Sequence, residues 1–187
     1  MQHTVAATPL PLEPVTMKLG VLFPAVRLEP YTPAWADAYV EERDRISSVL
    51  GDRILGIEHV GSTAIPEICA KPIIDIAVAV RNLEAAERFA PLMARIGYDY
   101  AGDGGVPGHR IFGRGPRIRT HLVHAVVADG EAWRNYLAFR DALSSDQELA
   151  KEYDSLKRGL AAKFPDDRPS YTAAKGHFIE RVLRGAT

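Results

Sequence analysis

The sequence is poor in cysteine, because Cys69 is the single cysteine among its 187 residues. One cysteine excludes a disulfide within the chain and argues against a cysteine-based zinc site. The sequence also lacks an apolar run near the ~20 residues that a membrane helix needs. Pro24 interrupts the apolar stretch from Leu19 to Val26, and no convincing cleavage site follows it. We therefore expect no membrane span and no signal peptide, and the expected location is the cytoplasm.

An excess of charge of either sign is also missing, since the formal net charge is −1. This balance gives no broad attraction to nucleic acids or to anionic membranes, so neither is an expected partner. The sequence contains no Walker-type lysine loop, no dinucleotide-binding fingerprint and no zinc-ligand spacing. The protein classes that carry those signatures are therefore not indicated.

What the sequence does contain is enough chain for one domain with a full hydrophobic core. Its beginning is rich in proline and threonine and has no hydrophobic periodicity, so we expect residues 1–24 to form a loose N-terminal extension. Residues 25–187 show neither an internal repeat nor a second boundary, and we expect them to form a single domain.

Helical and strand-like patterns alternate through the first two thirds of this domain, and helical patterns fill the rest. Thr32-Pro33 is a helix-start signal, and the hydrophobic spacing that follows predicts a helix to about Leu50. Period and turn residues predict strands over 53–60, 73–80, 98–101, 109–112 and 119–127, and helices over 82–96, 131–143, 147–164 and 172–183. This distribution is typical of an α+β fold.

The segment Gly61-Ser62-Thr63 breaks a predicted strand and precedes a short helical turn. Such a turn places backbone N–H groups and hydroxyls together, which suits a phosphate or another anion, and Gly61 allows close approach of the backbone. The next strand carries Asp75 within an apolar run, and a buried carboxylate needs a partner. A Mg²⁺ ion that holds substrate phosphates is one such partner. The alternative is an ordinary tight turn, with Asp75 capping neighbouring backbone.

Several separated motifs in this order resemble the GrpB family, and together they span nearly the whole chain beyond about Val26. The segments that carry the resemblance are 58–66, 70–76, 119–124, 139–143 and 171–179. The resemblance implies a nucleotidyltransferase-like fold of the DNA polymerase β type, with a small mixed sheet, flanking helices and a helical C-terminal part. In that superfamily a Gly-Ser turn, here Gly61-Ser62, holds the triphosphate, and aspartates spaced Asp-x-Asp on the next strand bind divalent metal.

The chain departs from that pattern at the second aspartate, where Ala77 stands. Two-metal chemistry needs several oxygen ligands, so Asp75 alone implies at most one metal ion, expected to be Mg²⁺. His121 and His124 are three residues apart on a predicted strand and therefore point to opposite faces. We expect His121 to join the polar pocket, because it shares a face with Arg119, and His124 to be a packed residue.

Five cationic side chains are candidates for contacting the anion: Lys71, Arg110, Arg119, Arg140 and Lys175. Lys71 lies close in sequence to the Gly-Ser turn, and Lys175 shares a helix face with Tyr171, four residues earlier. The arginines offer bidentate contacts to phosphate. For each of the five, the alternative is a solvated or salt-bridged surface residue.

Two main functions follow from these residues. The first is an enzyme that transfers a nucleotidyl or phosphoryl group to a small molecule with Mg²⁺, with Asp75 and His121 as catalytic groups. The second is a non-catalytic module that binds a nucleotide or another small anionic ligand on the same fold. A third possibility is a reaction at a transition metal held by His121 and Asp75. In some relatives a domain of this kind is joined to dephospho-coenzyme A kinase, which implies a nucleotide or pantetheine context.

Overall fold

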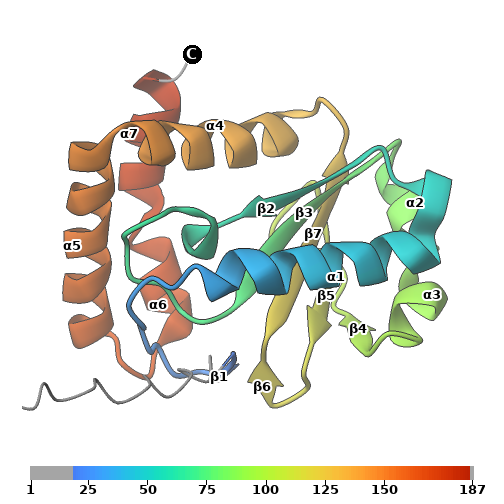
Figure 1. Cartoon of the computed structure of the whole chain (residues 1–187), viewed down its shortest axis with the longest axis horizontal. Helices are drawn as coiled ribbons and strands as arrows, with labels where there is room; N and C mark the ends of the chain where they lie inside the picture. Colours follow the sequence, from blue (N-terminus) through green and yellow to red (C-terminus); the bar gives the residue numbers. More distant parts are fainter. Residues whose placement is uncertain (1–18, 186–187) are drawn as a thin grey trace, which may run out of the picture.

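A five-stranded mixed sheet lies at the centre of the computed structural model, which describes residues 19–185 (Figure 1). The strand order is β2-β3-β7-β5-β4, and β3 and β7 are parallel while the other neighbours are antiparallel. The strands of this sheet are β2 (Gly56–Val60), β3 (Ile74–Val80), β4 (Tyr98–Tyr100), β5 (His109–Arg114) and β7 (His121–Val127). A second, two-stranded sheet pairs β1 (Val21–Leu22) with β6 (Ile118–Arg119).

The helices fall into two groups, one on each side of the central sheet. Helices α1 (Ala34–Leu50), α2 (Leu83–Glu87) and α3 (Ala90–Ala94) pack on one face. The chain after β7 supplies the second group: α4 (Glu131–Ser145), α5 (Gln147–Lys163), α6 (Arg168–Ala173) and α7 (Gly176–Gly185). Figure 1 shows α1 crossing in front of the sheet and the second group gathered toward one end of the molecule. The predicted α+β fold, with a mixed sheet, flanking helices and a helical C-terminal part, is confirmed.

Two predicted helices are each divided into two. The helix expected over 82–96 begins as predicted, with the Asn82 side chain accepting a hydrogen bond from the Ala85 amide. It then stops at Glu87, because the ring of Pro91 would clash with the carbonyl four residues earlier. The helix expected over 172–183 is instead α6 followed by α7, with Gly176 at the start of the second.

The central strand β3 is buried along nearly its whole length, as its continuous apolar sequence predicts. Its residues Ile74, Ile76 and Val78 pack against the α1 face, together with Val123 of β7 and side chains from α1, α2 and α3. A second apolar cluster joins α4, α5 and α7 around Ile65, Leu143 and Phe178. The sheet is therefore held from both sides, and the segment between β2 and β3 is fixed by the second cluster.

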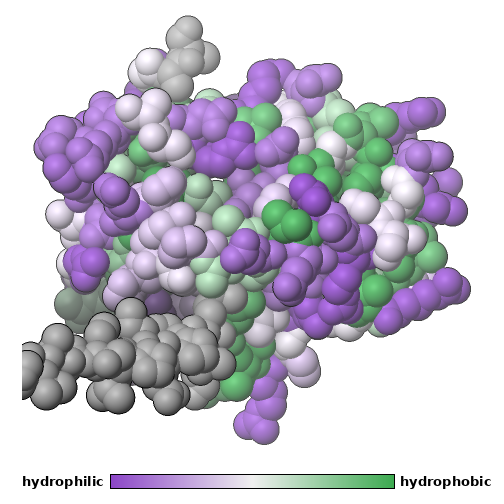
Figure 2. All heavy atoms as spheres, in the orientation of Figure 1, coloured by the Kyte–Doolittle hydropathy of each residue, from purple (hydrophilic) through white to green (hydrophobic). Residues whose placement is uncertain are grey.

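The loose extension predicted for residues 1–24 lies largely outside the described residues. Within the described part of it, Val21 and Leu22 form β1 and pair with β6, and the boundary at residue 25 stays a prediction. From the α1 side, hydrophilic side chains cover most of the surface and apolar ones are scattered among them (Figure 2). Across residues 19–185, the helices all fall short of the length and apolarity that crossing a membrane requires.

Candidate functional site

The parallel pairing of β3 with β7 decides which side chains share a face of the sheet. Asp75 is opposite Leu122, and Ala77 is opposite His124, so these four residues point to the face away from α1. A cavity of about 1060 Å³ opens on that face, between the sheet and the C-terminal helices. Apart from tyrosines, its polar lining comes from the turn after β2, the start of β3, strands β5 and β7, helices α4 and α6, and the turn before α7: Ser62, Lys71, Asp75, His109, His124, Glu131, Asn135, Arg168, Thr172 and Lys175.

Gly61 and Asp75 are in direct contact at one end of this cavity. Gly61 has φ of 71°, in the left-handed region that favours glycine. A Cβ built at Gly61 would lie 2.6 Å from Asp75 Oδ2 and 2.9 Å from Asp75 Cβ. Only glycine therefore lets the turn approach the carboxylate this closely, so the Gly-Ser turn and the strand aspartate meet at one place, as the sequence predicts.

Asp75 is paired with His124 of the neighbouring strand. His124 Nε2 lies 3.4 Å from Asp75 Oδ1, and the two side chains are 15% and 31% exposed. Burial by itself would raise the pKa of Asp75, but His124, Lys71 and Lys175 outweigh it and leave that pKa below its ordinary value. Asp75 is therefore an ionised acceptor, and the imidazole donates to it. His124 Nδ1 is buried and, among residues 19–185, has no hydrogen-bond partner.

Two lysines lie against the same aromatic ring of the cavity lining, that of Tyr171. Lys71 Nζ lies 5.2 Å and Lys175 Nζ 4.7 Å from the centre of the Tyr171 ring. Burial, together with the positive charge of Arg168, lowers the pKa of Lys71 to about 7 and that of Lys175 to about 8, although Asp75 acts in the opposite direction. The amines are thus poorly solvated and repel nearby cations, and an anion between them would relieve both effects.

Side chains of α5 hydrogen-bond to the backbone of the segment that carries Lys71. Asp154 accepts a hydrogen bond of 2.6 Å from the Cys69 amide, and Lys157 donates its Nζ to the Cys69 carbonyl. Cys69 itself is buried, and burial raises the pKa of its thiol to about 11. The backbone at Cys69, two residues before Lys71, is therefore fixed by hydrogen bonds from a helix about 85 residues later in the chain.

The charge of this end of the cavity favours an anion over a metal ion. With both lysines protonated, Lys71, Lys175 and Arg168 stand against one carboxylate, Asp75, which leaves a net charge of +2. A Mg²⁺ ion needs several oxygen ligands, and within residues 19–185 no three His, Cys, Asp or Glu side chains gather closely enough to hold a metal. The donor set at Asp75 therefore does not fit a resident Mg²⁺, and Mg²⁺ stays a prediction from the family resemblance.

Of the predicted anion-binding residues, Gly61, Ser62, Lys71 and Lys175 line the cavity with Asp75. The other four lie outside it. Thr63 is buried and contacts His59 Nε2 at 3.0 Å and the Ile73 carbonyl at 3.4 Å. The three arginines are paired with acidic residues: Arg110 with Glu87, Arg119 with Asp99 and Arg140 with Glu58.

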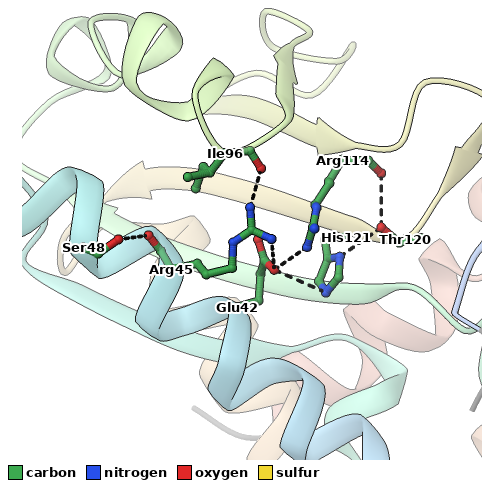
Figure 3. Close-up of polar contacts among 7 residues, drawn as sticks. All are labelled: Glu42, Arg45, Ser48, Ile96, Arg114, Thr120 and His121. Atoms are coloured by element: carbon green, nitrogen blue, oxygen red, sulfur yellow. Dashed lines mark hydrogen bonds and ion pairs between the residues drawn. The ribbon is translucent and has the colours of Figure 1, made fainter.

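The expectation that His121 shares a pocket with Asp75 is wrong. His121 is opposite Ile74 in the register, so it points to the α1 face, where its Nε2 lies 3.9 Å from Glu42 Oε2 (Figure 3). Arg114 donates to the same carboxylate oxygen at 2.6 Å. Burial lowers the pKa of His121 to about 4, so this histidine is neutral near pH 7. A metal site built from His121 and Asp75 is excluded by the same geometry, because the two side chains lie on opposite faces of the sheet.

Sequence reasoning missed three residues at the cavity: His124, Arg168 and Tyr136. The spacing of the two histidines showed that only one of them faces the site, but the face is set by the register with β3, which the nearly continuous apolar sequence of β7 does not reveal. Arg168 follows the Asp167 cap of α6 and has no recognisable motif around it. Only the packing of α6 against α5 brings it to the cavity.

Comparison with known proteins gives one family. The family model described as GrpB protein matches residues 25–185. The chain is 40% identical over 156 residues to UPF0157 protein YqkA of Bacillus subtilis, covering 83% of this chain and 46% of YqkA. It is 34% identical over 170 residues to the glutamate-rich protein GrpB of Alkalihalophilus pseudofirmus, covering 88% of this chain and 98% of that protein. The crystal structure of GrpB from Enterococcus faecalis is similar, with a TM-score of 0.79, 36% identity, and coverage of 86% of this chain and 96% of that one.

A more distant similarity links the chain to part of a longer protein. It is 27% identical over 186 residues to a dephospho-CoA kinase of Mycolicibacterium paratuberculosis, covering 86% of this chain and 46% of the kinase. The chain thus spans about half the length of two of these relatives, YqkA and the kinase.

Proposed function

The chain belongs to the GrpB family, and from the cavity described above we propose that it binds a nucleotide or another small phosphorylated molecule there. The observation that carries the proposal is the cluster of Lys71, Lys175 and Arg168 around Asp75 in a cavity large enough for a small molecule. Its net charge of +2, with both lysines protonated, matches one phosphate dianion. Ligand sites in proteins are typically cavities of ~300–1,000 Å³ with a few convergent polar groups.

The cavity holds its cations before any ligand is present. Lys175 is kept at the ring of Tyr171, and Lys71 lies at the same ring, two residues after the backbone that α5 fixes at Cys69. Because the positive charges are close together and partly desolvated, binding of a dianion would replace repulsion by attraction without moving the backbone. The Ser62 hydroxyl lies at the same end of the cavity and would add a donor.

A second candidate is nucleotidyl or phosphoryl transfer on a polymerase β-type fold. It is favoured by the contact between Gly61 and Asp75, which places a Gly-Ser turn against an ionised carboxylate on the following strand. Asp75, hydrogen-bonded to His124, would then accept the proton of an acceptor hydroxyl. Similarity to a dephospho-CoA kinase supports a context of phosphorylated ligands for either candidate. The Mg²⁺ dependence expected from the family is part of this second candidate only.

Titration calorimetry with inorganic phosphate and with ATP, in the presence of EDTA, tests the first candidate. We expect both to bind, and we expect Lys175→Met to weaken binding at least ~10-fold, since it removes a poorly solvated charge from the site. Lys151→Met is the matched control, because that lysine pairs with Glu148 on the exposed surface of α5. No binding to the unaltered protein, or equal binding to Lys175→Met, would overturn the proposal.

The second candidate is tested by turnover. The protein is incubated with ATP or CTP, an alcohol acceptor and Mg²⁺, and release of pyrophosphate or ADP is followed. Turnover that disappears in Asp75→Ala, with ATP binding retained, would establish transfer as the activity of the site. Turnover that survives in Asp75→Ala would refute the role of that carboxylate as the proton acceptor.

A further inference from the structure

The cavity is elongated, and β7 gives its length. Leu122 lines the cavity at the level of Asp75, and Val127 lines it at the last residue of the same strand. Five residues of strand at roughly 3.3 Å each separate these two positions by ~16 Å. A phosphate group fills only a few ångströms at the Asp75 end, so most of the cavity is left for the rest of the ligand.

The two ends of the cavity differ in chemistry. The cations among its lining residues, Lys71, Arg168 and Lys175, all interact electrostatically with Asp75 and so lie at one end. The end near Val127 is lined by apolar residues, including Val106 and Pro107 of the loop before β5. Val106 is 47% and Val127 37% exposed. Large apolar side chains left this exposed around a concave surface are typical of a ligand contact.

Among the described lining residues, the one charged side chain at the Val127 end is acidic. Glu131 begins α4, directly after Gly130, and lines the cavity there. A second phosphate or carboxylate at that end would meet a like charge and no Lys or Arg among the described lining residues. The arm of the ligand that reaches this end is therefore uncharged.

Aromatic rings line the passage between the two ends. The ring centre of Tyr136 lies 5.2 Å from that of His124 and 5.7 Å from that of His109. Burial lowers the pKa of His109, which keeps its ring neutral near pH 7. The ring faces of Tyr136 and His109 offer a flat surface of the kind that packs against hydrocarbon or planar groups.

From this arrangement we infer that the ligand is a phosphomonoester with an uncharged, largely apolar arm. Its phosphate lies at Lys71, Lys175 and Arg168, and its arm runs along β7 past Tyr136 to Val106 and Val127. The inference rests on the proposed function, since the phosphate end is the site proposed above, and it adds the class of molecule that the rest of the cavity selects.

Calorimetry with a homologous series tests the inference: inorganic phosphate, then methyl, butyl, hexyl and decyl phosphate, all in EDTA. The extended decyl chain is long enough to reach the far end of the cavity. Each methylene that becomes buried strengthens binding by up to about fourfold. We therefore expect decyl phosphate to bind at least ~30-fold more tightly than methyl phosphate, with most of the gain in the longer members. If affinity does not depend on chain length while inorganic phosphate still binds, the inferred apolar arm is contradicted and the proposed function is not. No binding of any member would overturn both.

A pair of substitutions tests whether the arm of the ligand lies in the cavity. Val106→Asn introduces a polar side chain at the far end without adding charge, and Val40→Asn makes the same change on α1, where Val40 is 42% exposed. We expect Val106→Asn to weaken decyl phosphate at least ~5-fold and to leave inorganic phosphate within about twofold, by loss of apolar contact. Val40→Asn should change neither. Equal decyl phosphate affinity in all three proteins would show that the arm lies elsewhere and would contradict the inference. Thermal unfolding of each variant confirms that it is folded.

Discussion

The two faces of the central sheet use the same kinds of residue for different purposes. On the α1 face, His121 lies beside Glu42, and Arg114 and Arg45 both approach that carboxylate (Figure 3). On the other face, three residues along the same strand, His124 contacts Asp75 at the edge of a cavity. Each face thus holds a histidine and a carboxylate, yet only one of them is open to a ligand.

The difference lies in where the cations find their partners. Around Glu42, the positive charges of Arg114 and Arg45 meet an acidic group of the protein itself, with Nη1 atoms at 2.6 and 3.8 Å from Oε2. Around Asp75, the lysines and Arg168 exceed the nearby carboxylate by two charges. The two arginines at Glu42 leave an excess of one positive charge, and both are about a third or more exposed to water. The excess of two at Asp75 rests partly on poorly solvated amines and favours a counter-ion from outside. The proposed function follows from that excess.

The largest effect is expected on the packed face. Glu42→Ala removes the carboxylate from Arg114 and His121 and leaves a cation partly buried without a partner, which typically costs about 3–5 kcal/mol. Urea unfolding should show this loss of stability, while the folded fraction keeps its phosphate affinity. Glu41→Ala, at the exposed neighbouring position, is the control and should stay within ~0.5 kcal/mol of the unaltered protein. Weakened phosphate binding by folded Glu42→Ala would mean that the two faces are not independent.

A smaller loss of stability is expected at the turn beside Asp75. Gly61→Ala and Gly97→Ala both place a side chain at positive φ, 71° and 84°. Only the first meets an obstacle, since a Cβ at Gly97 has nothing within 4 Å. Gly61→Ala should therefore lose about 1–3 kcal/mol more than Gly97→Ala in urea unfolding, and it alone should weaken phosphate binding. Equal behaviour of the two variants would show that the contact with Asp75 is not tight.

The pH dependence of the cavity should have opposite signs for binding and for stability. Burial and neighbouring cations lower the pKa of Lys71 to about 7 and of Lys175 to about 8. As the pH rises from 7 to 9 the amines lose protons. Affinity for a phosphomonoester, which is dianionic above its second pKa of ~6, should therefore fall by up to tenfold per pH unit for each amine that is deprotonated.

The free energy of unfolding of the ligand-free protein should change the other way. Above pH 7 the unfolded chain, in which both lysines titrate near ~10.5, binds more protons than the folded one, so these two lysines make stability rise with pH up to about that value. Calorimetry and urea unfolding at pH 7, 8 and 9 measure the two trends. The double variant Lys71→Met/Lys175→Met should lose both, and trends that persist in it would have to come from other groups.

The elements that local pattern defines were predictable from the sequence, and the long-range ones were not. The apolar run of β3, the spacing of α1 and the Gly61-Ser62 turn each follow from a few adjacent residues, and all three are present. The contact of that turn with Asp75 was predictable because both flank one short connection. Which histidine faces the cavity depends on how β7 pairs with β3, almost fifty residues away in the sequence. The prediction of His121 was wrong, because the register places His124 there. Arg168 reaches the cavity only through the packing of α6, which no local signal encodes.

The central claim is that Lys71, Lys175 and Arg168 bind the phosphate directly. The alternative is that Asp75 holds a metal ion and the metal ion binds the phosphate. Asp75→Asn distinguishes these cases, because the amide keeps the shape of the side chain and removes its charge. Titration of the variant with a phosphomonoester in EDTA should give an affinity equal to that of the unaltered protein, or up to several-fold higher, since one repulsive carboxylate is gone. Adding Mg²⁺ should not strengthen binding by either protein. A loss of ten-fold or more in Asp75→Asn, or binding by the unaltered protein only when Mg²⁺ is present, would contradict the account.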